Sequence, residues 1–270
     1  MKTAVVIPTL NAASDGRWEQ LLEAVNGQTC PGLCKIVLDS SSTDDTCAVA
    51  RLHNWKTLRL NRKNFNHGKT RDRIAKILYK RGFDTVVFLT QDCIPASPDS
   101  ISTLIDFLWN NDISGCCGRQ ISNHKRTLNG WQRSYSYPEK SCIKSSSDLA
   151  KGDGRAIFFS NAFSAWKTKD VRNAGGFPET AFGEDTLLAL RILQLGGKIG
   201  YCAEAAALHD HSDNLTELFR RGMQVGKFHR CHPEIRELAL HFNGKKPVPP
   251  LALLFPFMIK LCGYIAGRIL

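Results

Sequence analysis

Hydrophobic and polar positions divide the chain into short apolar runs and amphipathic stretches. Residues 86–89 form a continuous apolar run rich in β-branched and aromatic side chains, which is typical of a strand buried on both faces. The run stops at Asp92, shortly before Pro95. Open α/β sheets bind ligands at the carboxyl ends of their strands. Asp92 is therefore either a ligand-binding carboxylate or a residue that only shapes the turn.

The segments before this run repeat one pattern. Apolar runs that end at a polar residue alternate with stretches whose apolar positions recur at helical spacing, such as Trp18, Leu21, Leu22 and Val25. The predicted strands lie at residues 3–9, 35–38, around 58 and 86–89, and the predicted helices lie around residues 18–25, 44–51 and 74–78. This alternation predicts a parallel, doubly wound sheet whose strand ends face one crevice.

The second half of the chain is less regular. We expect helices from Ser97, from Glu184 and from about Asn214, and strands at residues 113–118 and 198–208. Regular structure is also expected at residues 156–159. Residues 119–154 are polar and Ser-rich without a clear period, which predicts a long functional loop.

The chain is strongly basic, with 36 Lys and Arg against 25 Asp and Glu and a net charge of +11. The excess is concentrated between Lys56 and Arg81, where Asp72 is the one acid. A basic surface favours an anionic partner: nucleotide phosphates, an acidic lipid surface or nucleic acid. The chain lacks helix-turn-helix, zinc-finger and ribonucleoprotein patterns, which counts against nucleic acid.

Ten cysteines stand in a chain that begins without a signal-peptide pattern. Neither Cys30 with Cys34 nor Cys116 with Cys117 has the second pair that a structural zinc site requires. We therefore expect reduced cysteines, most of them in the core, and a cytosolic protein.

Several short motifs in a fixed order give the chain a family resemblance. They are VIPTLN at residues 6–11, LDSSSTDDT at 38–46, FNHGKTR at 65–71, LTQD at 89–92, GRQ at 118–120, FSN at 159–161, GFP at 176–178 and GED at 183–185. This set resembles family 2 glycosyltransferases of the GT-A fold, and most closely the bacterial rhamnosyltransferases that use dTDP-rhamnose. The resemblance covers roughly residues 3–230. It implies an α/β fold with a mostly parallel twisted sheet flanked by helices.

The resemblance also implies where the nucleotide-sugar donor binds. Pro8, Thr9 and Asn11 match the first strand-end loop, and Asp39 matches the acid that faces the base and ribose. The other implied donor residues are Asn66, His67 and Arg71 near the diphosphate and Gln91 and Asp92 at the metal strand. An exposed helix amino terminus beside an arginine is a natural anion site, which fits this assignment.

The metal strand departs from the usual family pattern. The family commonly carries Asp-x-Asp, whereas Thr90-Gln91-Asp92 keeps only the last acid. The resemblance implies a divalent cation, Mn or Mg, on Asp92, with His209 or His211 as a further ligand. An imidazole suits Mn better than Mg.

The resemblance implies an inverting displacement in which a carboxylate removes the proton of the acceptor hydroxyl. Asp185 matches this base, with Glu184 as the substitute. Acids in a first helical turn are also favoured by the helix dipole, so their position alone does not establish catalysis. The implied acceptor-side residues are Arg119, Gln120, Ser160, Asn161 and Trp166.

The pattern divides the chain into a catalytic domain at residues 1–212, with a donor half at 1–118 and an acceptor half at 119–212, and a helical region at 213–270. The last 20 residues are apolar but contain Pro256, Lys260 and Arg268, which argues against a stable membrane span. We expect this tail to lie in the interface of an anionic membrane, on the inner face of the plasma membrane. The other interpretation is a helix packed on the sheet. A peripheral position would bring a lipid-linked saccharide acceptor within reach.

Two other functions fit parts of the sequence. A nucleotidyltransferase also uses strand-end acids and a metal, but the turn after the first strand lacks a Gly-rich loop with lysine. A non-catalytic basic module would tolerate the loss of Asp39, Asp92 and Asp185. Even within the glycosyltransferases, another nucleotide sugar is an alternative donor.

Overall fold

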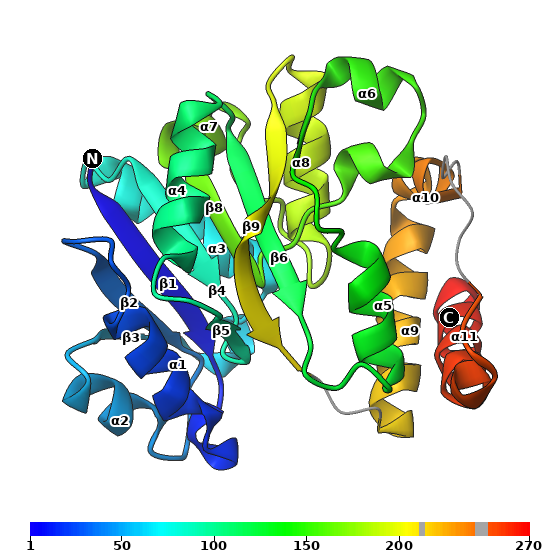
Figure 1. The fold of residues 1–270 in the computed structure, drawn as a ribbon, viewed down its shortest axis with the longest axis horizontal. Coiled ribbons are helices and arrows are strands. Elements are labelled where there is room, and N and C mark those ends of the chain that lie inside the picture. Colours follow the sequence, from blue (N-terminus) through cyan, green and yellow to red (C-terminus); the bar gives the residue numbers. More distant parts are fainter. Residues whose placement is uncertain (211–213, 241–247) are drawn as a thin grey trace.

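The computed structural model describes residues 1–210, 214–240 and 248–270 (Figure 1). A nine-stranded sheet runs in the order β3-β2-β1-β4-β8-β6-β9-β5, and β7 pairs with β9 beside this path. The strands are β1 (Thr3–Thr9), β2 (Cys34–Asp39), β3 (Lys56–Arg59), β4 (Thr85–Leu89), β5 (Cys93–Pro95), β6 (Gly115–Ile121), β7 (Cys142–Lys144), β8 (Phe163–Lys167) and β9 (Ile199–His209).

Helices cover both faces of the sheet. The α-helices are α1 (Arg17–Asn26), α2 (Thr46–Leu52), α3 (His67–Lys80), α4 (Ser100–Asn110), α5 (Leu128–Ser136), α6 (Ser146–Ala150), α7 (Thr168–Asn173), α8 (Glu184–Gln194), α9 (Leu215–Cys231), α10 (Pro233–Leu240) and α11 (Leu254–Ile269). Short 3-10 helices are η1 (Ala12–Asp15), η2 (Arg62–Asn64), η3 (Gly154–Ile157) and η4 (Leu251–Leu253). Successive strand residues point to opposite faces. Val5 accordingly enters a core cluster with α1 and α4, whereas Val6 enters a second cluster with α3, α7 and α8.

The two halves of the sheet are built differently. Strands β3, β2, β1 and β4 are parallel to one another, as the sequence predicts. Beyond β4 the sheet is mixed: β8 runs antiparallel to both β4 and β6, and β5 and β7 run antiparallel to β9. The α/β class and the flanking helices match the prediction. β6 and β9 are parallel to each other and run in the same direction as β1–β4, so most strands are parallel as expected and β8, β5 and β7 are the exceptions.

The structure differs from the expectations for the second half in two segments and adds one strand. Residues 119–154 contain α5, β7 and α6 and are therefore not one irregular loop. Of residues 156–159, only the first two belong to a regular element, the 3-10 helix η3. The sequence does not predict the buried strand β8 that follows. β7 and α6 are only three and five residues long, too short to display a hydrophobic period.

The cysteines are all free, but only Cys93, Cys116, Cys117 and Cys202 are buried. Three others are partly buried and three are exposed. The expectation that most of them lie in the core is therefore wrong.

Two glycines let loops approach helix starts at the crevice. A Cβ on Gly68, in the first turn of α3, would lie 1.7 Å from the carbonyl oxygen of Pro178. Gly183 precedes α8 with φ +74, and a Cβ there would lie 2.5 Å from the ring of Phe228 on α9. Close backbone approach and positive φ both favour glycine. The motifs at residues 65–71 and 183–185 are thus partly fixed by packing.

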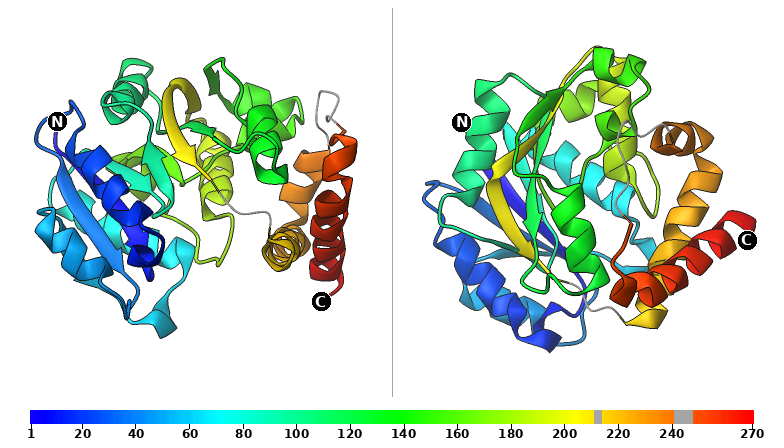
Figure 2. Two further views of the ribbon diagram at one scale, coloured as in Figure 1. Left: turned by 60° about the horizontal axis from the view of Figure 1, so that its bottom comes forward. Right: turned by 45° about the vertical axis from the view of Figure 1, so that its right-hand side comes forward.

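The carboxyl-terminal helices α9 and α11 lie side by side at one end of the molecule (Figures 1 and 2). Gly222 and Gly226 of α9 and Gly263 and Gly267 of α11 each face the backbone of the other helix, where a Cβ would come within 2.0–2.2 Å of a carbonyl oxygen. Small residues four apart allow helix backbones to approach this closely. Phe228 of α9 packs against Phe182 beside the start of α8, with ring centroids 5.6 Å apart. α9 is therefore joined to the catalytic body.

Candidate active site

The loops after β1 and β2 are joined by hydrogen bonds at the crevice. The Asn11 N–H donates to Ser42 Oγ at 2.8 Å, and the Thr43 N–H donates to Asn11 Oδ1 at 2.9 Å. Asn11 has φ 49, a left-handed conformation that asparagine tolerates. The Asp39 carboxylate accepts the Ser42 N–H at 3.1 and 3.2 Å and is 1% exposed. Asp39 thus stabilises the turn after β2 by accepting a backbone hydrogen bond within it.

The loop after β4 holds the loop after β1. Gln91 Oε1 accepts the Leu10 N–H at 2.8 Å, and Gln91 Nε2 donates to the Leu10 carbonyl at 3.3 Å. The structure therefore gives Gln91 a positioning role. Pro8 lies in β1 just before this loop.

Three buried hydroxyl oxygens at neighbouring strand ends have no hydrogen-bond partner among the described residues. They belong to Thr9 at the end of β1, Ser40 after β2 and Thr90 after β4. A buried polar atom without a partner usually marks a place for a water, an ion or a ligand. These three hydroxyls are available to bond a water, an ion or a ligand at this edge of the sheet.

The predicted diphosphate residues at the start of α3 have internal partners. Asn66 caps α3 by accepting the Lys69 N–H at 3.0 Å. Arg71 is buried, and its Nη1 lies 3.0 Å from Glu184 Oε1 and 3.2 Å from His67 Nδ1. Arg71 is therefore an internal ion-pair partner and not an open phosphate ligand. His67 is exposed beside it.

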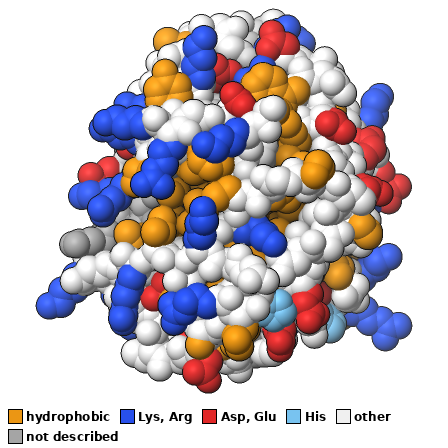
Figure 3. Space-filling view, turned by 90° about the vertical axis from the view of Figure 1, so that its left-hand side faces the viewer, with side chains coloured by type: hydrophobic (Ala, Val, Ile, Leu, Met, Phe, Trp, Pro, Cys, Tyr) orange, Lys and Arg blue, Asp and Glu red, His pale blue; other side chains and the backbone are white. Residues whose placement is uncertain are grey.

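Most of the remaining basic cluster between Lys56 and Arg81 faces solvent. All ten of its Lys and Arg residues except Arg71 are exposed. The face viewed from the β2 and β3 side carries many Lys and Arg side chains around a hollowed surface (Figure 3). This distribution matches the predicted attraction of anions.

A second set of polar residues connects β4, β6 and β9. His209 Nε2 lies 3.3 Å from Asp92 Oδ1, and its Nδ1 lies 2.6 Å from Gln120 Oε1. Gln120 Nε2 donates to Ser160 Oγ at 2.9 Å. The set joins four predicted residues on separate strands and loops.

The carboxylate of Asp92 and the imidazole of His209 are ligand groups that suit a divalent cation. An amide oxygen can only accept, so the proton of neutral His209 resides on Nδ1 and the Nε2 lone pair faces the Asp92 carboxylate. Burial holds the pKa of His209 below its ordinary value, although the attraction between a protonated His209 and Asp92 opposes this shift. A carboxylate and an imidazole with a hydrogen-bonded second nitrogen are typical metal ligands. The predicted ligand His211 lies outside the described residues.

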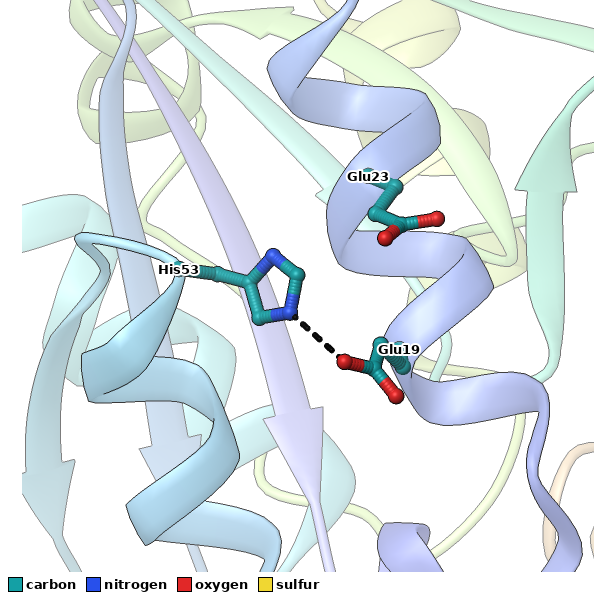
Figure 4. A group of neighbouring side chains, drawn as sticks. All are labelled: Glu19, Glu23 and His53. Carbon is teal, nitrogen blue, oxygen red and sulfur yellow. Dashed lines mark hydrogen bonds and ion pairs between the residues drawn. The ribbon is translucent and has the colours of Figure 1, made fainter.

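One other group in the described chain has ligand atoms close together. It consists of Glu19, Glu23 and His53 on the outer surface of α1 and α2 (Figure 4). His53 Nε2 lies 3.2 Å from Glu19 Oε1. This arrangement joins two helices as an exposed pair and is separate from the predicted site.

The two acids at the start of α8 have different environments. Glu184 is buried, pairs with Arg71 and accepts from Asn161 Nδ2 at 3.1 Å. Burial favours the neutral carboxyl, but attraction to Arg71 and the Asn161 bond hold the pKa of Glu184 below its ordinary value. Glu184 therefore stays charged and fully engaged within the protein.

Asp185 is half-buried and accepts the Asn161 N–H at 2.9 Å and its neighbour's N–H, that of Thr186, at 2.8 Å. Burial and the nearby charge of Glu184 raise the pKa of Asp185 to about 7, against the effect of these two bonds. A carboxylate with a pKa near the working pH is suited to proton transfer.

The predicted acceptor-side residues are divided between surface and core. Arg119 is partly exposed and lies 2.7 Å from Glu139. Trp166 is fully buried and donates from Nε1 to Asn161 Oδ1 at 2.9 Å. Direct contact of Trp166 with an acceptor is thus contradicted, because its role is to hold Asn161. Asn161 and Gln120 are also buried, whereas Ser160 is half-buried.

One candidate residue was missed. Arg133 of α5 is 8% exposed and has no carboxylate within ion-pair distance among the residues that the structure describes. Burial lowers the pKa of Arg133, while attraction to Asp92 raises it. Arg133 and Gln120 both line a cavity of about 190 Å³. The absence of a hydrophobic period in residues 119–154 hid the helix that positions Arg133.

Comparison with known proteins agrees with this geometry. Residues 2–223 match the family described as glycosyltransferase like family 2. The chain is 38% identical to the O-antigen chain rhamnosyltransferase RfbN of Salmonella typhimurium, over 87% of this chain and 75% of that protein. It is 34% identical to the O-antigen chain rhamnosyltransferase WbaN of Salmonella anatum, over 86% and 73%.

A solved structure shares the fold at lower identity. The mannosyltransferase PcManGT from Pyrobaculum calidifontis, in complex with GDP-Man and Mn2+, superposes with a TM-score of 0.60 at 18% identity, over 99% of this chain and 72% of that one. The family resemblance and the GT-A fold are therefore confirmed. The chain belongs to glycosyltransferase family 2.

Proposed function

We propose that the protein transfers L-rhamnose from dTDP-rhamnose, with inversion, to a lipid-linked or surface-polysaccharide acceptor. The two relatives named as O-antigen chain rhamnosyltransferases support the sugar and the acceptor class. The observation that carries the chemistry is Asp185, a half-buried carboxylate whose pKa is raised to about 7.

In the proposed reaction Asp185 takes the proton of the acceptor hydroxyl, and the hydroxyl oxygen forms a bond to the anomeric carbon of the donor sugar. The bond from that carbon to the donor phosphate breaks, and the nucleoside diphosphate leaves with the electron pair. Asn161 orients Asp185 through its N–H, and Glu184 holds Asn161 and Arg71 in place. Glu184 is thereby a positioning residue.

Asp92 and His209 would hold a divalent cation, Mn or Mg. Such an ion neutralises the charge of the departing diphosphate. Gln120 fixes the tautomer and orientation of His209, as partners of metal ligands commonly do. Arg133 lies within electrostatic reach of Asp92 and adds positive charge on the same side.

The donor nucleotide would lie over the joined loops after β1, β2 and β4. Thr9 and Asp39 are the last residues of β1 and β2, whereas Asn11 and Gln91 lie in the loops after β1 and β4. The unpartnered hydroxyls belong to Thr9 and to the residues that follow β2 and β4. The exposed lysines and arginines at residues 56–81 would attract the donor to this edge.

The region at 213–270 would place the enzyme on the inner face of the plasma membrane. The stretch Leu251–Ile269 is the one helical segment in the described chain long and apolar enough to cross a membrane. The residues that its helix α11 exposes form an apolar stripe of Phe255, Met258, Cys262, Ile265 and Ile269.

The polar side chains of α11 turn toward the protein. Lys260 Nζ donates to Gln132 Oε1 at 2.6 Å, and Arg268 Nη1 donates to the His229 carbonyl at 2.8 Å. A helix that turns its polar groups inward and its apolar stripe outward favours contact with lipid. We place the domain boundary at 212/213, although α9 packs on α11 and also contacts Phe182, just before α8.

One experiment tests the donor assignment. The protein is incubated with dTDP-rhamnose, UDP-sugars or GDP-sugars in the presence of Mn or Mg, and release of nucleoside diphosphate is followed. We expect release from dTDP-rhamnose, faster than from the others. Faster release from another sugar would change the donor, and release from none would contradict the proposed activity.

A second experiment tests the membrane assignment. Truncation after Pro250 removes α11, and we expect loss of co-sedimentation with anionic liposomes while donor hydrolysis persists. Ile265→Lys in the full chain serves as the matched variant, because it changes the stripe without touching the glycine contacts. Unchanged sedimentation of both variants would overturn the assignment.

A further inference from the structure

Two adjoining cavities lie beside the catalytic residues. The smaller one, about 190 Å³, is lined by Gln120 and Arg133. The larger one, about 430 Å³, lies between the end of α5, β7 and the start of β9. Ser136 and Phe158 line both cavities, so the two are neighbours that share part of a wall. Gln120 bonds His209 and Ser160, so this space begins at the proposed metal site.

The charged residues that line the larger cavity are all cations. They are Lys140, Lys144 and Arg155, and the aromatic rings of Tyr135, Phe158 and Tyr201 complete much of the wall. A volume of this size and a wall of aromatic residues with a few polar groups are typical of small-molecule sites. The cations specify an anionic ligand.

Lys144 is the one buried residue among these three cations. Its side chain is 8% exposed, and its Nζ donates to the Phe158 carbonyl at 3.0 Å and lies 5.5 Å from the centroid of the Phe158 ring. No carboxylate lies within ion-pair distance of it in the described ranges, and Asp153 attracts its charge only from farther away. An ammonium has three donors, and burial of a charge without a counter-ion is costly. An anion in the cavity would remove that cost.

A structural role for Lys144 is the main alternative. β7 is a short strand that pairs only with β9, and an inward-pointing charge on such a strand discourages association with other sheets. That role requires neither the adjoining cavity nor the additional cations Lys140 and Arg155. The alternative predicts no effect of Lys144 on ligand binding.

We propose that the larger cavity binds the diphosphate of a prenyl-linked acceptor, with Lys144 as its buried counter-ion. The acceptor sugar would then extend through the smaller cavity toward Asp185. The aromatic wall would contact the first part of the prenyl chain. This inference rests on the proposed transfer to a lipid-linked acceptor and names the group of that acceptor which is recognised.

The test is a binding measurement with the full chain, independent of turnover. Farnesyl diphosphate, farnesol and methyl glucuronide are titrated in excess chelator and saturating dTDP, which keeps the probes from the metal and donor sites. We expect farnesyl diphosphate to bind at least about tenfold more tightly than farnesol, or roughly 1.4 kcal/mol. Tighter binding of methyl glucuronide would replace the diphosphate with a carboxylate and overturn the proposal.

Variants assign the effect to the cavity. Lys144→Met should abolish the preference for diphosphate, and Lys144→Arg should retain it. Lys151→Met is the matched control, because Lys151 is exposed, pairs with Asp148 and does not line the cavity. An unchanged preference in Lys144→Met would overturn the proposal.

If Lys144→Met does not fold, a second variant still tests whether the cavity binds the diphosphate. The double variant Lys140→Met with Arg155→Met changes only exposed lining residues and should weaken farnesyl diphosphate binding several-fold. Unchanged binding there would also count against the cavity. Failure of dTDP-rhamnose hydrolysis in wild-type protein would instead contradict the proposed function, so the two failures are distinguishable.

Discussion

The donor side and the catalytic side of the crevice are held together in different ways. On the donor side, backbone N–H groups bond to short polar side chains in loops that directly follow strands, as Asn11 and Ser42 show. On the catalytic side, buried charged side chains from distant segments pair with one another, as Arg71 and Glu184 show. Loss of one donor-side bond should weaken ligand binding, whereas loss of one buried charge should affect the chemistry or the fold.

The adjacent acids of α8 sharpen this contrast most. Asp185→Asn should reduce turnover by about 10²–10⁴-fold, the usual contribution of a general base. Asparagine can still accept the Asn161 N–H, so donor affinity should be unchanged. Steady-state rates and donor binding by calorimetry measure the two effects. Retention of more than about a tenth of the wild-type rate would assign the base to another group.

The pH dependence gives the same variant a second test. Since the base must be ionised and the pKa of Asp185 is raised to about 7, wild-type kcat/KM should fall as pH drops below about 7. A raised carboxyl pKa also means that the native state loses stability as pH rises toward 7. Asp185→Asn should therefore be no less stable than wild type above pH 7.

Glu184→Gln should mainly reduce the stability of the protein, unlike Asp185→Asn, which should mainly reduce turnover. It leaves Arg71 buried without its charge partner, and breaking such a pair costs about 3–5 kcal/mol of unfolding free energy. Urea denaturation measures this loss. Because the pKa of Glu184 is lowered, the pair's contribution is present at neutral pH and disappears in acid as Glu184 is protonated. A stable Glu184→Gln protein without activity would exchange the roles of the two acids.

Glu184 and Asp185 also show which features of the site can be predicted from the sequence and which cannot. The first half of the sheet follows from regular alternation, and the motif order identified the family and named Asp185. The pairing of Glu184 with Arg71 could not be predicted, because their contact depends on how α3 and α8 pack. Arg133 and Lys144 stayed hidden because α5 and β7 lie in a stretch without a hydrophobic period. Trp166 was placed at the acceptor by family position, although burial directs it toward Asn161.

Asp92→Ala tests the proposed metal site, which lies between the donor side and the catalytic side of the crevice. We expect metal affinity to fall by at least the roughly 10–100-fold seen when a ligand's supporting partner is removed. Chelation of wild-type protein should reproduce the loss of rate. Gln120→Ala is the related variant, because it removes the bonds to His209 Nδ1 and Ser160 Oγ but leaves both metal ligands in place, and it should have a smaller effect. Full activity of Asp92→Ala in excess chelator would assign leaving-group stabilisation to cations such as Arg133.

Asp39→Ala should have the smallest effect and act on binding alone. The carboxylate is almost fully buried and accepts the Ser42 N–H, and Ser42 in turn accepts the Asn11 N–H. Its loss loosens the loop far from the bond that breaks, so donor KM should rise about tenfold, or roughly 1.4 kcal/mol, with little change in kcat.

Ser42→Ala is the matched control for this effect. It keeps the N–H that bonds Asp39 and removes only the hydroxyl that accepts from Asn11. A smaller rise in KM is expected, because one bond of the joined loops is lost and the buried carboxylate keeps its partner. A fall in kcat at constant KM in Asp39→Ala would place this residue with the catalytic side and remove the distinction between the two halves of the crevice.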